Sequence, residues 1–180
     1  MDRSDSERRW DETPIERARN LFAGLGERFG LEFEWDETAP VEVACRFPAQ
    51  KGLDFELWLS LSGDEFICSG ETWYATIFPA DDEYKWGIFA RLIEELISGE
   101  ARVVLYQALG WSKPYWTIVQ LRIDDRWTSV STGAGCAMPP IVRRTILRNG
   151  YRPAIGLFRP AFGSAIVLTA VFGLIYWALM

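Results

Sequence analysis

Two carboxylates and two indoles on neighbouring predicted strands are the first residues whose types and spacing suit chemistry. They are Glu56, Glu71, Trp58 and Trp73. Apolar and polar residues alternate along residues 53–62, and Gly63-Asp64 is typical of a hairpin turn into a second strand over residues 65–78. In that register, Glu56 lies opposite Glu71 on the solvent-facing side of the hairpin.

Such a pair of acids suits hydrolysis. Carboxylates held close together shift each other's pKa and can divide the acid and base roles, and flanking tryptophan faces bind sugars. One hypothesis is therefore a hydrolase of a carbohydrate-like substrate with Glu56 and Glu71 as the catalytic candidates. The alternative is that both acids simply lie on a solvated strand of an acidic chain.

A second group combines two tryptophans with an arginine. The turn Asp124-Asp125 between two predicted strands places Arg122 opposite Trp127, which suits a cation–π contact. Tryptophan and arginine contribute most of the energy at many protein interfaces, so these side chains are candidates for contact with a partner. The predicted partner-binding residues are Trp58, Trp73, Trp116, Arg122 and Trp127. The alternative is structural stacking on a half-exposed sheet face.

Several kinds of reaction centre are excluded by the residues that the sequence lacks. There is no histidine, which removes serine–histidine and cysteine–histidine nucleophiles and histidine-ligated zinc. Cys45, Cys68 and Cys136 form no CxxC pair and are odd in number, which argues against a zinc site or a disulfide framework. The glycine-rich residues 133–135 are not followed by the lysine or helix that a phosphate-binding loop requires. We therefore expect no metal and no cofactor, and favour a binding module over an enzyme.

The positions of these residues depend on two helices and a set of short strands. Residues 13–16 form a capping box with proline at the first helical position, and an apolar stripe follows as far as Phe29. Asp82 and Gly99 bound a second amphipathic helix. Period-two alternation predicts strands at 31–35, 41–47, 53–62, 65–78, 101–109, 114–123 and 126–132. The predicted fold class is α+β, an antiparallel sheet of about seven strands with the two helices packed on one face.

This order of elements resembles, at the level of the fold alone, the small acidic secretion chaperones, whose elements run α-β-β-β-α-β-β. No sequence motif accompanies the resemblance. It implies a soluble, chaperone-like dimer as an alternative function, and it leaves a homo-oligomer open.

Charge is unevenly distributed along the chain, whose formal net charge is −6. Residues 1–142 hold all 25 acidic residues and 14 of the 19 basic ones, a net charge of −11. Residues 143–180 hold only the basic residues Arg143, Arg144, Arg148, Arg152 and Arg159. An acidic domain does not suit nucleic acid, whose phosphates require clustered basic side chains. The five arginines suit an anionic membrane surface, where each contributes about 1 kcal/mol.

Residues 161–180 contain no charged residue and predict a transmembrane helix. A helix of this length rises about 30 Å, the thickness of the hydrocarbon core of a bilayer. Tyr176 and Trp177 match the aromatic belt at its far end, and arginines lie only on its N-terminal side. The positive-inside rule then places the preceding domain in the cytoplasm, with a single span. The alternatives are a buried core helix, the first span of a longer chain and a spurious extension.

These patterns predict four segments. They are a disordered N-terminus at 1–12, an acidic α+β domain at 13–140, a basic juxtamembrane segment at 141–160 and a transmembrane helix at 161–180. The predicted function is a non-catalytic protein-interaction module at the cytoplasmic side of a membrane, which binds membrane lipid through its C-terminal part and a protein partner through its domain. The hydrolase and the chaperone-like dimer remain the alternatives.

Overall fold

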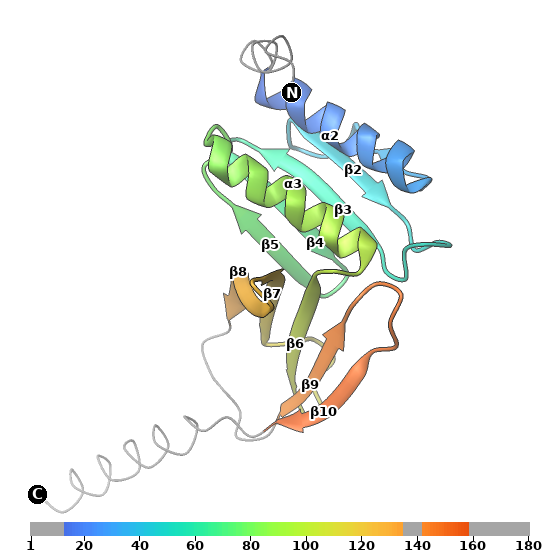
Figure 1. Ribbon diagram of the computed structural model, residues 1–180, viewed down its shortest axis with the longest axis vertical. Helices are drawn as coiled ribbons and strands as arrows, with labels where there is room; N and C mark the ends of the chain where they lie inside the picture. Colours follow the sequence, from blue (N-terminus) through green and yellow to red (C-terminus); the bar gives the residue numbers. More distant parts are fainter. Residues whose placement is uncertain (1–12, 135–141, 159–180) are drawn as a thin grey trace, which may run out of the picture.

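The computed structural model describes residues 13–134 and 142–158, and within them the protein is α+β with two helices and two five-stranded antiparallel sheets (Figure 1). The first sheet has the order β1-β2-β3-β4-β5: Glu34–Trp35, Val43–Phe47, Leu57–Ser62, Glu65–Gly70 and Trp73–Ile77. The second has the order β10-β9-β6-β7-β8: Ala154–Phe158, Val142–Leu147, Arg102–Ala108, Trp116–Ile123 and Arg126–Ala134. Helix α2 (Pro14–Phe29) precedes the first sheet, and α3 (Glu83–Ser98) lies between the two sheets in the chain.

Both helices begin and end where the sequence predicts. The Thr13 hydroxyl accepts a hydrogen bond from the backbone N of Glu16 at 3.2 Å, and the Glu16 carboxylate accepts one from the backbone N of Thr13 at 2.9 Å. The Asp82 carboxylate accepts a backbone hydrogen bond in the first turn of α3. Gly30 and Gly99 follow the helices with φ of 62° and 78°. These caps satisfy backbone groups that a helix end leaves unpaired.

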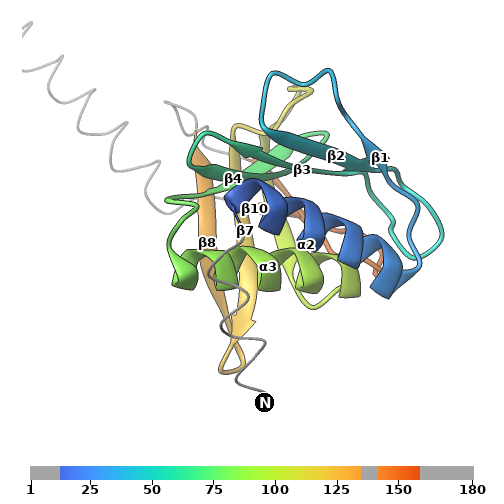
Figure 2. The ribbon, with the colours of Figure 1, turned by 90° about the horizontal axis from the view of Figure 1, so that it is seen from above.

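The core of the first sheet lies under its two helices, which both cover the same face (Figure 2). Phe89 of α3 stacks on Phe66 of β4 with ring centroids 4.6 Å apart, and Phe22 of α2 lies 6.3 Å from Phe89. All three side chains are fully buried. Burial of each is worth about 1.5–3 kcal/mol, so this aromatic cluster holds both helices on the sheet.

Two predicted hairpins are confirmed. Gly63-Asp64 joins β3 to β4, with Leu61 opposite Phe66. Asp124-Asp125 joins β7 to β8, and its two residues have φ of 48° and 59°. Such left-handed values are typical of the two-residue turns that match the twist of an antiparallel pair.

The predicted single strand over 65–78 is wrong. It is two strands, β4 and β5, joined by a tight turn in which Gly70 pairs with Trp73. A Cβ atom at Gly70 would lie 2.4 Å from the indole nitrogen of Trp73, so the missing side chain makes room for the returning tryptophan. The buried positions are even-numbered in β4 and odd-numbered in β5, so the turn shifts the alternation by one residue. The prediction of one continuous strand missed this shift.

The expectation of one sheet of about seven strands is also wrong. Residues 142–158, which the sequence analysis assigned to a juxtamembrane segment, form β9 and β10 of the second sheet. β9 pairs with β6, which places Arg144 opposite Tyr106. This pairing joins segments far apart in the chain, and local periodicity carries no information about such partners.

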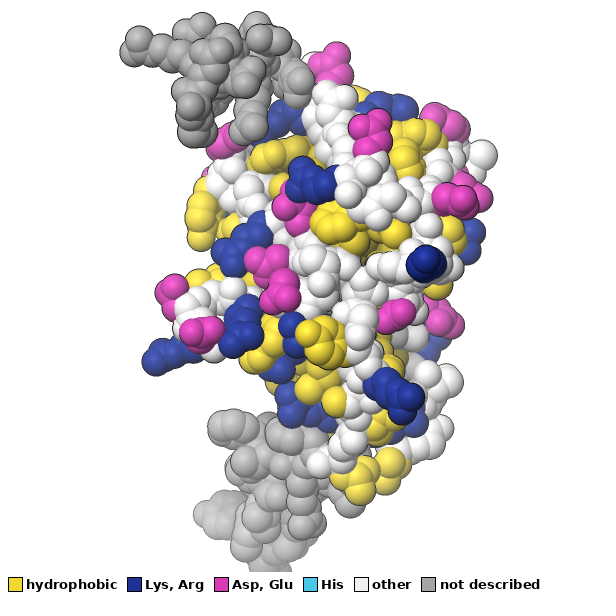
Figure 3. Space-filling view, turned by 45° about the vertical axis from the view of Figure 1, so that its right-hand side comes forward, with side chains coloured by type: hydrophobic (Ala, Val, Ile, Leu, Met, Phe, Trp, Pro, Cys, Tyr) yellow, Lys and Arg dark blue, Asp and Glu magenta, His cyan; other side chains and the backbone are white. Residues whose placement is uncertain are grey.

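Charge divides between the two halves of the described fold. Residues 13–100 contain 18 acidic and 7 basic residues, a net charge of −11, whereas residues 101–158 contain 2 acidic and 8 basic residues, a net charge of +6. Figure 3 shows Lys and Arg side chains gathered over the lower part of the visible face, where the second sheet lies. The second sheet is therefore a basic surface on an acidic protein.

The predicted transmembrane helix at 161–180 lies outside the described residues, as does the segment 1–12. The membrane-interface candidates Arg159, Tyr176 and Trp177 lie outside them too. In the ranges 13–134 and 142–158, no helix is long and apolar enough to span a bilayer.

Asn149, in the turn between β9 and β10, connects the second sheet to the first half of the chain. Its side chain is 7 % exposed. The amide oxygen accepts a hydrogen bond from the backbone N of Asp54 at 2.8 Å, and the amide nitrogen donates to the carbonyl oxygens of Gly52, at 2.7 Å, and Ile97. The Asp54 carboxylate in turn accepts a hydrogen bond from the backbone N of Gly150 at 2.7 Å.

We expect Asn149→Ala to lower the free energy of unfolding by about 2–3 kcal/mol, because the buried Ile97 carbonyl and part-buried backbone groups of Gly52 and Asp54 lose this partner. Urea unfolding followed by tryptophan fluorescence measures the change. Asn20→Ala is the matched control, since Asn20 is the other asparagine of the sequence and lies exposed on α2. It should change stability by less than about 0.5 kcal/mol. Equal effects of the two substitutions would contradict the role given to Asn149.

Candidate functional site

Glu56 lies just before β3 and is bound to a cation and an indole. The Nε of Arg46 donates a hydrogen bond to its Oε2 at 2.8 Å, and a terminal nitrogen of Arg46 donates to the same oxygen. Trp58 donates its indole N–H to Oε1. The hydrogen bonds from Trp58 and from Arg46 lower the pKa of Glu56. A general acid at neutral pH needs a raised pKa, so this environment suits a permanently ionised carboxylate.

Glu71 and Trp73 do not complete a catalytic face around Glu56. Glu71 is exposed in the turn between β4 and β5, at the rim of a hollow of about 570 Å³. Trp73 is only 4 % exposed and packs edge-on against Phe55, with ring centroids 6.3 Å apart. The predicted solvent-facing position of Trp73 is wrong, because the tight turn at Gly70 directs the indole into the core. Of the two tryptophans in this group, Trp58 alone stays half-exposed on the outer face of the first sheet.

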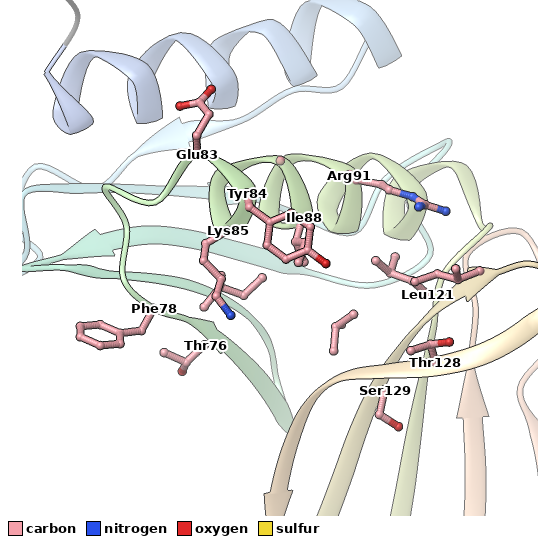
Figure 4. Close-up of a pocket in the computed structure, with 14 residues that line it drawn as sticks. Thr76, Phe78, Glu83, Tyr84, Lys85, Ile88, Arg91, Leu121, Thr128 and Ser129 are labelled. Carbon is pink, nitrogen blue, oxygen red and sulfur yellow. The ribbon is translucent and has the colours of Figure 1, made fainter. Parts of the chain in front are cut away.

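An open groove with a volume of about 850 Å³ lies between α3, the end of β5 and the β7–β8 hairpin (Figure 4). We call it the inter-sheet groove. Tyr84 and Ile88 of α3 line it, together with Phe78 after β5 and with Leu121 and Ile123 of β7. Phe78 and Tyr84 are 58 % and 74 % exposed. Large apolar side chains thus remain in contact with water around one hollow, a pattern typical of interaction sites.

The strands beside the inter-sheet groove are the edge strands of their sheets. β5 ends the first sheet and β8 ends the second. Gly133 of β8 lies close to Tyr74 of β5, since a Cβ atom there would be 3.7 Å from the tyrosine ring. The two edges therefore approach at one end, and the groove opens beside the other end of β5. In the described ranges, neither strand has a hydrogen-bonded neighbour on its outer edge.

Most charged groups around the inter-sheet groove already have partners. The Glu83 carboxylate binds Arg17 at 2.9 Å. The Arg91 guanidinium binds Glu95 at 2.6 Å and donates to the carbonyl oxygen of Arg122 at 3.0 Å. Lys85 is the lining cation whose amine makes no hydrogen bond or ion pair with another described residue. The groove is thus an apolar surface with one available amine, and no acid and base face each other across it.

On the second sheet, Arg122 lies opposite Trp127, as predicted. The guanidinium groups next to the Trp127 ring are, however, those of Arg102 and Arg148, whose Cζ atoms lie 4.0 and 5.8 Å from its centroid. Arg122 binds Asp125 at 3.0 Å. The predicted contact missed these arginines because they arrive from β6 and from the end of β9.

Trp116 lies on the same face of this sheet as Trp127. It pairs with Tyr106 of β6, and their rings stack with centroids 5.2 Å apart. Both rings are half-buried. The structure therefore brings Trp116, Arg122 and Trp127 onto one sheet face and separates them from Trp58 and Trp73.

Four of the five predicted membrane-interface arginines lie in the folded part of the chain, in β9 or the turn after it. They are Arg143, Arg144, Arg148 and Arg152. Arg143 donates to the Gln107 amide oxygen, and Arg148 donates to the Gly99 carbonyl. Their contact with lipid stays a prediction.

Arg102 and Tyr151 are site residues that the sequence analysis did not single out. A signal was available for the surface they share, since Arg144, Ile146 and Arg148 recur at every second position and so lie on one face of a strand. The centroid of the Tyr151 ring lies 4.0 Å from the Cζ of Arg148. Which aromatic rings these arginines meet depends on strand pairing and cannot be read from spacing.

The two thiols that the structure describes, Cys45 and Cys68, do not add a reactive centre. Burial raises the pKa of Cys45 to about 12 and also raises the pKa of Cys68. Neither is therefore a thiolate at neutral pH. Cys136 lies outside the described residues. Among the residues that the structure covers, no cluster of Cys, Asp and Glu could hold a metal ion.

We expect Glu56→Gln to lower the free energy of unfolding by about 1 kcal/mol at neutral pH, because it removes the ion pair with Arg46. The folded-state pKa of Glu56 is lowered, so its contribution is present above the unfolded-state pKa of about 4.3 and is lost as the pH falls through the folded-state value. Urea unfolding at neutral pH and near pH 3 measures this, and the gap between wild type and variant should shrink on acidification.

Glu65→Gln is the control for this experiment. Glu65 is exposed in β4, and its side chain makes no hydrogen bond or ion pair with another described residue. Its replacement should have little effect at either pH. A constant gap between wild type and Glu56→Gln at both pH values would contradict the stabilising role of the ionised carboxylate.

Two surfaces of the described fold thus qualify as sites, the inter-sheet groove and the arginine-bearing outer face of the second sheet. No protein-family model, no curated protein and no solved structure matches this chain.

Proposed function

We propose that this chain is a non-catalytic protein-interaction module that binds an extended segment of a partner protein in the inter-sheet groove. The observation that carries the proposal is the groove itself, an apolar hollow beside the edge strands β5 and β8. Apolar surface rimmed by polar groups is a recurrent feature of interaction sites.

An extended segment is the occupant that such a surface suits. Unpaired strand edges present backbone N–H and C=O groups, and an added strand pairs with them. Alternate side chains of the segment would pack against Tyr84 and Ile88 of α3. An acidic side chain of the segment at the rim of the groove would form an ion pair with Lys85. The chemistry therefore favours an apolar segment with a neighbouring acid.

We further propose that residues 161–180 hold this module at the cytoplasmic side of a membrane as a single span. The support is their length, their lack of charge and the arginines that precede them. β10 ends at Phe158, so the proposed span would follow the second sheet almost directly.

Site-specific photo-crosslinking of the full-length chain tests the groove. A benzophenone amino acid at Tyr84 should give one discrete crosslinked product in the cell, because this side chain lines the occupied groove. The same amino acid at Trp111 is the control, since Trp111 is 57 % exposed and lies in the β6–β7 loop, outside the groove. The Tyr84 product should disappear in the variant Ile123→Asp, which places a charge in the groove.

Three results would contradict the proposal. They are equal products from both positions, a Tyr84 product that persists in Ile123→Asp, and a product with twice the mass of the chain. The last would identify a second copy as the occupant and favour the chaperone-like dimer.

Membrane fractionation tests the span. The full-length chain should stay in the pellet after alkaline carbonate extraction, and deletion of residues 161–180 should move it to the supernatant. Deletion of residues 1–12, which are polar, is the control and should leave the chain in the pellet. Pelleting that survives removal of 161–180 would refute the proposed anchor.

A further inference from the structure

The outer face of the second sheet holds a pocket of about 380 Å³ that we call the arginine pocket. Four guanidinium groups and two aromatic rings line it: Arg102, Arg122, Arg148, Arg152, Trp127 and Tyr151. They come from β6, β7 and β8 and from the turn between β9 and β10. The opposite face of the same sheet contributes Val103, Val119 and Leu121 to the core, so the arginines occupy the face turned away from the core.

The positive charge of the arginine pocket is only partly neutralised. Asp125, the acidic residue of its lining, binds Arg122 at 3.0 Å. Glu100 lies 3.7 Å from a terminal nitrogen of Arg148, beyond hydrogen-bonding distance. Arg102 and Arg152 make no ion pair with any residue in the described ranges. Like charges gathered in a small, partly desolvated volume repel each other, so the free protein carries an electrostatic cost here.

Aromatic rings hold these guanidinium groups in place. The Cζ of Arg102 lies 4.0 Å from the centroid of the Trp127 ring, and the Cζ of Arg148 lies 4.0 Å from that of Tyr151. Cation–π contact uses the face of a guanidinium and leaves its in-plane N–H donors available. These arginine side chains are therefore already ordered in the free protein, and ligand binding costs less side-chain entropy than it would for a flexible arginine.

Donors remain available at and beside the arginine pocket. Arg102 donates its Nε to Gln120 at 2.9 Å, and its terminal nitrogens have no hydrogen-bond partner in the described ranges. Arg144, its neighbour across the sheet face, has a buried Nε without a partner among the same residues. Burial and the charges of Arg144 and Arg148 lower the pKa of Arg102. Buried donors without acceptors are uncommon in folded proteins, and oxygen atoms of an anion in the pocket would accept from the terminal nitrogens of Arg102, which lines it.

We propose that the arginine pocket binds a phosphate group carrying at least two negative charges. Guanidinium donors match the paired oxygens of phosphate in geometry, and a dianion matches the surplus of positive charge better than a single carboxylate does. The group can belong to a soluble phosphate compound or to the headgroup of a phosphorylated lipid. This inference does not rest on the proposed function of the inter-sheet groove, which lies at α3 and the edge strands.

Calorimetric titration of the full-length chain in non-ionic detergent tests the proposal with three probes: pyrophosphate, soluble inositol trisphosphate and a polyglutamate peptide. At least one of the two phosphate probes should bind at a single saturable site. Arg102→Gln should weaken that binding about tenfold or more, because it removes a charge-assisted contact.

Arg152→Gln should also weaken the binding of the phosphate probes. Arg152 is exposed and makes no hydrogen bond or ion pair in the described fold, so this variant should fold even if Arg102→Gln does not, and circular dichroism checks both.

Arg126→Gln is the matched control. Arg126 precedes Trp127 in β8 and does not line the arginine pocket, so its replacement removes the same charge from the same sheet outside the pocket. It should weaken binding less than about threefold.

The probes also separate the sources of the phosphate. Binding of inositol trisphosphate about tenfold or more tighter than that of pyrophosphate would support a lipid headgroup, and comparable affinities would support a soluble phosphate compound. Failure of both phosphate probes at millimolar concentration would overturn the proposal. Equal losses in all three variants, or binding of polyglutamate alone, would also overturn it, the last by assigning the surface to an acidic protein segment.

Discussion

The Asn149 side chain makes three hydrogen bonds at the junction of the two halves, and the positions of both candidate sites depend on them. Its partners are backbone groups of Asp54, Gly52 and Ile97. Ile97 lies in the last turn of α3, whose opposite end lines the inter-sheet groove. Arg148 and Tyr151 lie on either side of Asn149 and line the arginine pocket. One buried amide therefore joins the turn between β9 and β10 both to the end of α3 and to residues 52–54.

Close backbone approach makes that junction possible. A Cβ atom at Gly99 would lie 2.4 Å from the carbonyl oxygen of Asn149, and φ at Gly99 is 78°. A larger residue at this position would therefore have a strained left-handed backbone, and its side chain would also clash with the neighbouring β9–β10 turn. The residue that ends α3 is thus also the residue that lets the β9–β10 turn reach it.

The second sheet separates two kinds of surface by simple alternation along β7. Leu121 and Ile123 line the inter-sheet groove, while Arg122, between them, lines the arginine pocket. Successive side chains of a strand point to opposite faces, so a single strand serves an apolar surface and a basic one. The two sites can in this way be occupied at the same time, one by an apolar segment and the other by an anion.

The carboxylate chemistry that the sequence suggested is replaced by an ion pair. Glu56 is engaged by Arg46 and Trp58, and the first sheet places Arg46 directly opposite Trp58. An acidic half with a net charge of −11 has few basic residues to share, and Arg46 is shared with Glu56, one of its half-buried carboxylates. The tryptophan that looked like a sugar platform is instead the donor that helps to keep Glu56 ionised.

The sequence by itself determined the local features of this protein. Thr13 and Glu16 cap α2 through contacts three residues apart, and the turns at Gly63-Asp64 and Asp124-Asp125 follow from residues that tolerate left-handed backbone. Helix positions, the β3–β4 register and the α+β class follow from such short-range preferences. Only the tertiary structure decided the rest, because it depends on pairings between distant segments. These features are the division into two sheets, the turn at Gly70, the contact of Arg102 with Trp127 and the hydrogen bonds of Asn149. Each depends on which strands pair or which distant segments meet, and the local sequence does not specify that.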